Sequence, residues 1–252
     1  MQDDTTAVLR FQAEVLDDLE GLRIANENRM RQIMRPTGEL DADGHGRGLG
    51  MTLEDPAVKA LSRLLDRISE LEHEAVLELQ RAVRKHPLYP WIKAQRGIGE
   101  KQCARLLAAT GDPWWNGLHD RPRTVSELWA YCGYHTLPTS GDGSYQTAAK
   151  RAKGQRANWS ATAKMRAYLI AESVVKSGGP WREVYDRRKA STADHVHMVA
   201  CVRCGPSGKP ALPGSDWSAG HRHADALRVI AKEILKGLWL ASRDVRSGEK
   251  ET

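Results

Sequence analysis

The stretch from Pro90 to Asp112 constrains the fold most, because it places a Gly-Ile-Gly turn between two helix-forming segments. Glycine at positions 97 and 99 permits a turn that is too tight for residues with a Cβ, and Ile98 between them can anchor that turn in the core. After the turn, residues suited to a buried helix face recur at helical spacing: Cys103, Leu106, Leu107 and Thr110. The stretch therefore predicts a short helix, a hairpin turn and a second helix.

This turn and the helix after it form a candidate phosphate site. Backbone N–H groups at a helix start, together with the helix dipole, favour a bound anion. Lys101 and Arg105 lie four residues apart, so both can face the same anion. This is how a helix-hairpin-helix grips a nucleic-acid phosphate without reading sequence. We therefore expect Gly97, Ile98, Gly99, Lys101 and Arg105 to bind nucleic acid; the alternative is an ordinary helical turn with glycine at its C-cap.

Basic residues are concentrated in one block of the chain. The protein has 252 residues, a formal net charge of +6 and a pI of about 9.2. Residues 146–189 contain eleven Lys and Arg against three acids, a net charge of +8. Such a block indicates a polyanionic partner, most simply DNA or RNA, whereas a solvated helix face would mix both signs. The cations expected to contact nucleic acid here include Lys150, Arg151, Lys153 and Arg156.

Cellular location is addressed by three features of the sequence. No apolar run is long enough to span a bilayer, so no membrane partner is expected. The first residues, Met-Gln-Asp-Asp, do not resemble a signal peptide. A Cys-x-x-Cys pair supplies two of the four cysteines and does not require an oxidising compartment. We therefore expect a cytoplasmic protein.

Two amphipathic helices are predicted in the N-terminal third. The first occupies most of residues 1–35, and Pro36 ends it. A Gly-rich flexible linker follows over 36–54. The second helix, over 55–86, begins with Asp55 as N-cap and carries apolar residues at heptad-like steps. The two helices pair either as an antiparallel hairpin or with a second chain, and we expect a homo-oligomer formed through them.

The rest of the chain is also predicted to be helical. Helices are expected near 124–132, 160–177, 181–190 and 224–243, and no segment alternates convincingly enough for a buried strand. The sequence therefore predicts a mainly α protein. Its N-terminal helical hairpin or coiled coil precedes a helix-hairpin-helix-containing domain over 87–245, and a disordered tail covers 246–252.

Histidine and cysteine residues form a candidate metal site within residues 195–223. The pattern is His-x-His-x3-Cys-x2-Cys followed by His-x-His, which is good spacing for zinc ligands. The expected ligands are Cys201, Cys204, His221 and His223, with His195 and His197 as alternates. Four ligands leave no open position, so we expect structural zinc that staples the Gly/Pro-rich loop to the last helix. The alternatives are a reduced Cys pair beside surface histidines, or a metal nuclease of the His/Cys type.

One serine is a candidate nucleophile. Ser140 stands beside Gly141 in a loop next to the basic block, where its hydroxyl could attack a phosphodiester and form a covalent phosphoserine link. Arg166, or an arginine of the basic block, would stabilise the charge that develops on the phosphate. Locally, a Ser-Gly pair in an ordinary turn explains the same residues.

Several of these motifs together resemble one family. The region from about 90 to 243 is similar to the C-terminal transposase domain of insertion-sequence 110/116/902 type transposases. The positions that carry this resemblance are Gly97–Lys101, Leu106–Ala108, Gly111–Asp112, Leu128–Tyr134, Pro138, Ser140–Gly141, Lys164–Ala171 and Ala224–Trp239. The helices before position 86 would correspond to the coiled coil of the family.

The resemblance implies a DNA-binding recombinase that cuts and rejoins DNA through Ser140, with Arg166 in a catalytic role, during DNA transposition. The nuclease-like domain of the family, with its four acids, has no counterpart here. Complete strand exchange would therefore either need those acids from a separate partner chain or not occur. DNA is the expected partner, and a guide or structured RNA is a further one. Two alternatives remain: a non-catalytic nucleic-acid-binding accessory or regulatory protein, and a coiled-coil protein-interaction module.

Overall fold

The computed structural model describes residues 4–40, 42–46, 48–138, 145–147, 154, 157–206 and 209–248. Within them the prediction of a mainly α protein is confirmed. The helices are α1 Asp4–Met34, α2 Pro56–Val83, α3 Tyr89–Ala94, α4 Glu100–Thr110, α5 Val125–Tyr131, α6 Ala161–Ser177, α7 Pro180–Ser191 and α8 Ala219–Gly248. The strands are β1 Trp115–Asn116, β2 Arg121–Pro122, β3 Thr136–Pro138 and β4 Tyr145–Thr147.

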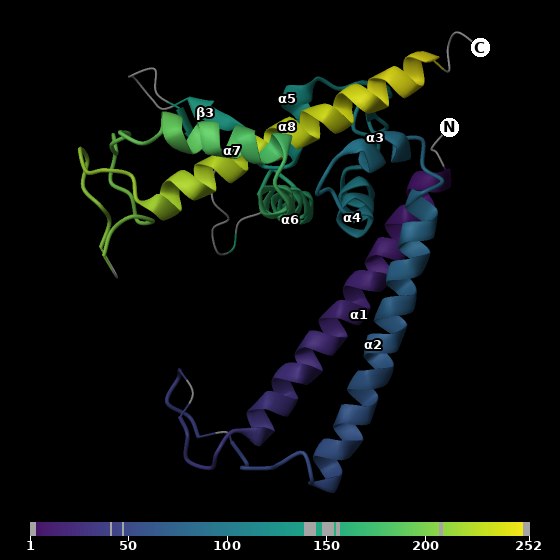
Figure 1. Ribbon diagram of the computed structural model, residues 1–252, viewed down its shortest axis with the longest axis vertical. Helices are drawn as coiled ribbons and strands as arrows, with labels where there is room; N and C mark the ends of the chain where they lie inside the picture. The colour runs from purple at the N-terminus through teal and green to yellow at the C-terminus, as the bar shows by residue number, and fades with distance from the viewer. Residues whose placement is uncertain are drawn as a thin grey trace.

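Helices α1 and α2 form an antiparallel helical hairpin that projects away from the other helices (Figure 1). Leu9 and Leu16 of α1 and Leu79 of α2 are fully buried. Nearer the C-terminal end of α1, Arg23 Nε donates a hydrogen bond to Glu72 Oε2 at 2.6 Å, which links the two helices. The pairing that the sequence left open is therefore made within one chain.

The Gly-Ile-Gly turn joins α3 to α4 and packs against α6. Gly97 has a φ of +86°, and a Cβ there would lie 2.5 Å from Ser177 Oγ and 2.9 Å from Val174 Cα. Ser173 Oγ also donates a hydrogen bond to the carbonyl oxygen of Gly97 at 2.9 Å. Glycine is needed at 97 for both its backbone conformation and this close approach.

Helix α8 is the main support of the C-terminal helices. It packs against α5, α6 and α7, with α7 running beside its first half (Figure 1). Its buried residues follow helical spacing: Leu227, Ile230, Ala231, Ile234, Leu235 and Leu238. The helix begins at Ala219, five residues before the start expected at 224. This earlier start places the His-x-His pair inside the helix, with His221 in its first turn.

The strands form two short antiparallel ribbons, β1 with β2 and β3 with β4. In the second ribbon Thr136 pairs with Thr147 and Pro138 with Tyr145. Among the described residues, no helix has the combination of length and apolar composition that crossing a membrane requires.

Candidate metal centre and nucleic-acid interface

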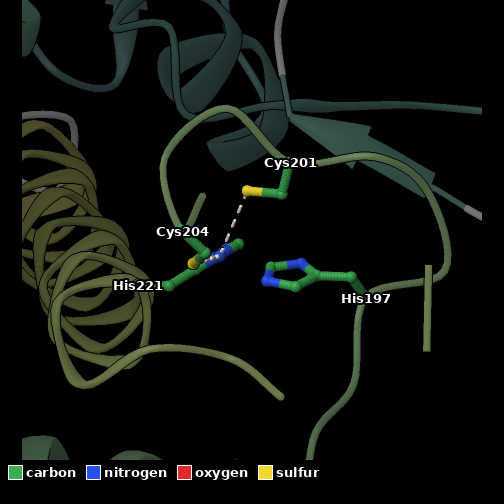
Figure 2. Close-up of side chains that lie close together, drawn as sticks. All are labelled: His197, Cys201, Cys204 and His221. Carbon is green, nitrogen blue, oxygen red and sulfur yellow. Dashed lines mark hydrogen bonds between the residues drawn. The ribbon is translucent and has the colours of Figure 1, made fainter. Parts of the chain in front are cut away.

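Four side chains converge at the start of α8. The ligand atoms of His197, Cys201, Cys204 and His221 all lie within 4.8 Å of one another. Figure 2 shows dashed contacts that join His221 to Cys201 and Cys204, with the ring of His197 beside them. His221 belongs to the first turn of α8. The other three belong to the segment before it, residues 195–218, which we call the metal loop.

Short backbone pairings hold the metal loop in place. Cys201 and Ala211 exchange N–H···O bonds of 2.9 and 2.8 Å. The N–H of His197 donates to Ser215 O at 2.8 Å, and Gly214 N–H donates to His197 O at 2.7 Å. His197 and Cys201 therefore lie on one backbone segment, which these bonds hold against residues 211–216.

The separations suit a tetrahedral metal ion. The Nδ1 atom of His221 lies 3.3 Å from Cys204 Sγ and 3.7 Å from Cys201 Sγ. Thiolate and imidazole ligands of a tetrahedral zinc ion lie about 3.3–3.8 Å apart. The Nε2 atom of His197 is buried and has no hydrogen-bond partner among the described residues. A buried ring nitrogen without a partner is explained if it binds a metal ion.

The surroundings favour the protonation states that bind metal. Burial lowers the pKa of His221, and the charges of His197 and Arg203 lower it further, so its neutral form is favoured. Burial alone would raise the pKa of the Cys204 thiol. Hydrogen bonds from Ser218 and Cys201, with the charge of Arg203, bring that pKa below its usual value. Neutral imidazole and thiolate are the forms that coordinate metals.

Two further residues orient these ligands. Trp217 stacks on His221 with ring centroids 4.1 Å apart and an interplanar angle of 8°. The Ser218 hydroxyl lies 3.1 Å from Cys204 Sγ and accepts a hydrogen bond from the N–H of His221 at 3.1 Å. Partners of this kind fix the geometry of ligands around a metal.

His223 lies outside this group, contrary to its place in the expected ligand set. Its Nδ1 atom is 2.6 Å from the Tyr185 hydroxyl of α7. Residues two apart on an α-helix point about 200° away from each other, so only one of His221 and His223 can face the metal loop. His197, named as an alternate, takes the fourth position, while His195 is exposed and meets Trp217 edge-on.

The predicted phosphate-binding side chains of α4 are covered by α1. Arg105 is only 2% exposed and is ion-paired with Asp17 and Glu20. Lys101 Nζ donates to Glu20 Oε1 at 3.2 Å. Arg166, the predicted catalytic arginine, is 5% exposed and donates from Nη2 to both carboxylate oxygens of Asp17 at 2.7 Å. In this arrangement neither arginine is open to a phosphate from solvent.

The turn before α4 also differs from an open anion site. Ile98 is buried, and Gly97 is used for packing on α6, while Gly99 is exposed as the N-cap of α4. The first residue of α4 is Glu100, whose carboxylate accepts hydrogen bonds from Arg84 and Tyr89. The hydrogen bonds from Arg84 lower the pKa of Glu100, so this helix start already carries a negative charge.

The remaining predicted residues lie outside the described part of the chain. They are Ser140, Lys150, Arg151, Lys153 and Arg156. Ser140 falls in the sequence between β3 and β4.

Sequence reasoning missed Asp17 and Glu20, because nothing in a single helix sequence shows which acid will meet a distant arginine.

Comparison with protein-family models and with curated proteins finds no match for this chain.

Proposed function

We propose that this chain is a zinc-stabilised DNA-binding protein whose C-terminal part contacts the phosphate backbone. The observation that carries the proposal is the division of charge. Residues 1–85 have 12 Lys and Arg against 17 Asp and Glu, a net charge of −5, whereas residues 86–252 have 26 against 15, a net charge of +11. A part this basic attracts a polyanion, and the contact carries no sequence information of its own.

Zinc is the metal that best suits the donor set. Two thiolates and two imidazoles are soft and borderline ligands, and four protein ligands favour a closed structural site. The metal loop exposes most of its apolar side chains, including Met198 at 79%, Val202 at 69% and Leu212 at 72%. Since the loop buries too little to hold itself together, we propose that zinc supplies its order.

Metal analysis of matched variants tests the zinc proposal. Wild-type protein purified without chelators is expected to contain about one zinc per chain, and His197→Ala to lose it. His223→Ala is the matched control, because it removes a nearby histidine that bonds Tyr185 instead. Equal zinc loss in both variants, or zinc-free wild-type protein, would contradict the proposed ligand set.

Salt dependence tests the DNA-binding proposal. Binding of labelled duplex DNA is measured by fluorescence anisotropy between 50 and 200 mM salt. If several phosphates are contacted, log affinity falls steeply and linearly with log salt concentration, by about 0.9 for each contact. A flat dependence or no binding would reject the proposal, and tighter binding to a structured RNA would change the partner.

The family resemblance extends this proposal to chemistry. We propose that Ser140 attacks a phosphodiester and becomes linked to one DNA end, while the other end leaves with a free hydroxyl. Since Arg166 is paired with Asp17, another cation would have to stabilise the phosphate unless α1 moves. A covalent protein–DNA adduct on a denaturing gel, present in wild type and missing in Ser140→Ala, is the expected result. If both proteins bind DNA and neither forms the adduct, the non-catalytic accessory function is favoured.

A further inference from the structure

Three cations of the C-terminal part meet two carboxylates of the helical hairpin. Lys101 and Arg105 come from α4 and Arg166 comes from α6; we call these three the basic cluster. Asp17 and Glu20 lie three residues apart on one face of α1, and their carboxylates cover the basic cluster. The cluster thus joins residues that the sequence marked separately for phosphate binding and for catalysis.

The two carboxylates leave the basic cluster incompletely satisfied. Arg105 bonds both acids through Nη2 alone, and Arg166 bonds Asp17 through Nη2 alone. Arg105 Nε, Arg105 Nη1 and Arg166 Nε are buried and have no partner among the described residues. In a well-matched ion pair, a carboxylate usually accepts hydrogen bonds from two nitrogen atoms of the same guanidinium. The cluster therefore has N–H donors that α1 does not bind. Its three cations also exceed the two carboxylates of α1 by one positive charge.

The basic cluster can be reached by a ligand from solvent. Asp17 keeps 38% of its side-chain surface exposed, although the arginines beneath it are buried. A cavity of about 280 Å³ opens beside Asp17 and Arg105, and Ser160 and Thr162 at the start of α6 also line it. The N-terminus of that helix adds a partial positive charge on the same side.

We infer that the basic cluster is a DNA phosphate site that α1 masks, with Asp17 and Glu20 in the place of the phosphate. This inference rests on the proposed DNA binding and adds regulation to it. A phosphate offers more acceptor oxygens than one carboxylate, so it can also accept hydrogen bonds from the guanidinium nitrogens that the two acids leave without a partner. The exchange keeps the buried arginines paired, which matters because an unpaired buried charge is strongly destabilising.

Masking has a cost that weakens DNA binding by the wild-type protein. Leu9 and Leu16 are fully buried in the same core, so moving α1 away exposes apolar surface as well as breaking ion pairs. DNA binding must supply this free energy. The acidic hairpin thereby sets the affinity of the basic part without touching DNA itself.

The test compares two charge-matched variants of the full chain. Asp17→Asn/Glu20→Gln removes the acids over the basic cluster and keeps their shape. Asp66→Asn/Glu70→Gln makes the same change in net charge at exposed positions of α2. We expect the first variant to bind duplex DNA about tenfold or more tightly than the second at the same salt concentration. Adding Arg166→Gln to the first variant should remove this gain.

Other outcomes separate failure of the inference from failure of the proposed function. Equal affinity of the two variants, or weaker binding by the first, overturns the masking but leaves DNA binding in place. No binding by wild type or either variant overturns the proposed function itself.

Hydrogen exchange on the wild-type chain keeps the inference testable if the first variant does not fold. Masking predicts that the amides of α1 around Asp17 lose protection when DNA binds. Unchanged or increased protection in bound wild-type protein would contradict it.

Discussion

The helical hairpin and the metal loop are both poor in internal core, yet they are organised in different ways. The hairpin buries regularly spaced residues such as Leu9, Leu16 and Leu79 against a neighbouring helix. The metal loop exposes its apolar side chains and brings four ligand atoms to one point. Periodic burial spreads stability over many contacts, whereas a metal site concentrates it in a few bonds. The two regions should therefore fail separately and under different conditions.

Loss of metal is expected to have the largest effect, confined to one region. Cys204→Ser, or a chelator added to wild type, should increase amide exchange in the metal loop by about a hundredfold or more, because the proposed zinc ion would supply the free energy of local folding. Exchange in α2 should change by less than about twofold. Mass spectrometry of exchanged protein measures both regions at once. If α2 exchanged faster by the same factor, the two regions would not be independent.

Truncation of a buried leucine tests the opposite region. Leu16→Ala should lower the free energy of unfolding by about 2–5 kcal/mol, through lost burial and the cavity left behind. The matched control is Leu22→Ala on the same helix, where the side chain is 48% exposed, and it should cost about 0.5 kcal/mol. Urea unfolding measures the difference, and zinc content should remain the same in both. Equal losses for the two variants would place Leu16 outside the core.

Acid should weaken the contact between the hairpin and the basic cluster. Burial alone would raise the pKa of Glu20, but hydrogen bonds and charge from Arg105, with Lys101, lower it from 4.5 to about 2. Because the folded-state pKa is the lower one, this stabilisation is complete above about pH 4.5 and is lost as the pH falls toward 2.

The size of the acid effect is read from a difference. Because Glu20 is partly solvated, the effect of its charge is moderate. We expect the free energy of unfolding of the wild type to exceed that of Glu20→Gln by about 1–2 kcal/mol at pH 6 and by almost nothing near pH 2. Because both proteins contain the same metal loop, comparing them cancels the effect of acid on the proposed metal site. A difference that stays constant with pH would show that the Glu20 charge does not contribute.

The smallest effect is expected at an exposed ion pair of α1. Arg10 Nε lies 3.3 Å from Glu14 Oε1, and both side chains are about two-thirds or more exposed. Arg10→Ala should change the unfolding free energy by less than about 0.5 kcal/mol, because water screens the pair. Thermal unfolding at two salt concentrations measures it. A larger loss would mean that Arg10 also contributes to packing against α4.

Helices could be predicted from the sequence because they depend on local spacing. The regular apolar residues of α1 and α2, and Asp55 with Pro56 at the start of α2, placed these helices within a few residues of their observed ends. The start of α8 was placed too late, since Ser218 accepts the His221 N–H and extends the helix backward. That error concealed which histidine faces the metal loop.

Contacts between distant segments could not be predicted in this way. The pairing of Arg105 and Arg166 with Asp17 joins three helices that are far apart in sequence. Lys101 and Arg105 were correctly placed on one helix face, but the spacing did not show that an acidic helix would cover that face. A pair of acids three residues apart is common on solvated helices, so Asp17 and Glu20 carried no distinctive signal.

The stacking of Trp217 on His221 gives the metal centre an optical reporter of its own. An indole held 4.1 Å from a ligand ring should change its emission when that ring coordinates a metal ion. Cobalt in place of zinc would add thiolate-to-metal absorption from Cys201 and Cys204. Titration with either ion can therefore be followed in the intact chain by light alone, and Trp217→Phe would separate this signal from the emission of the other seven tryptophans.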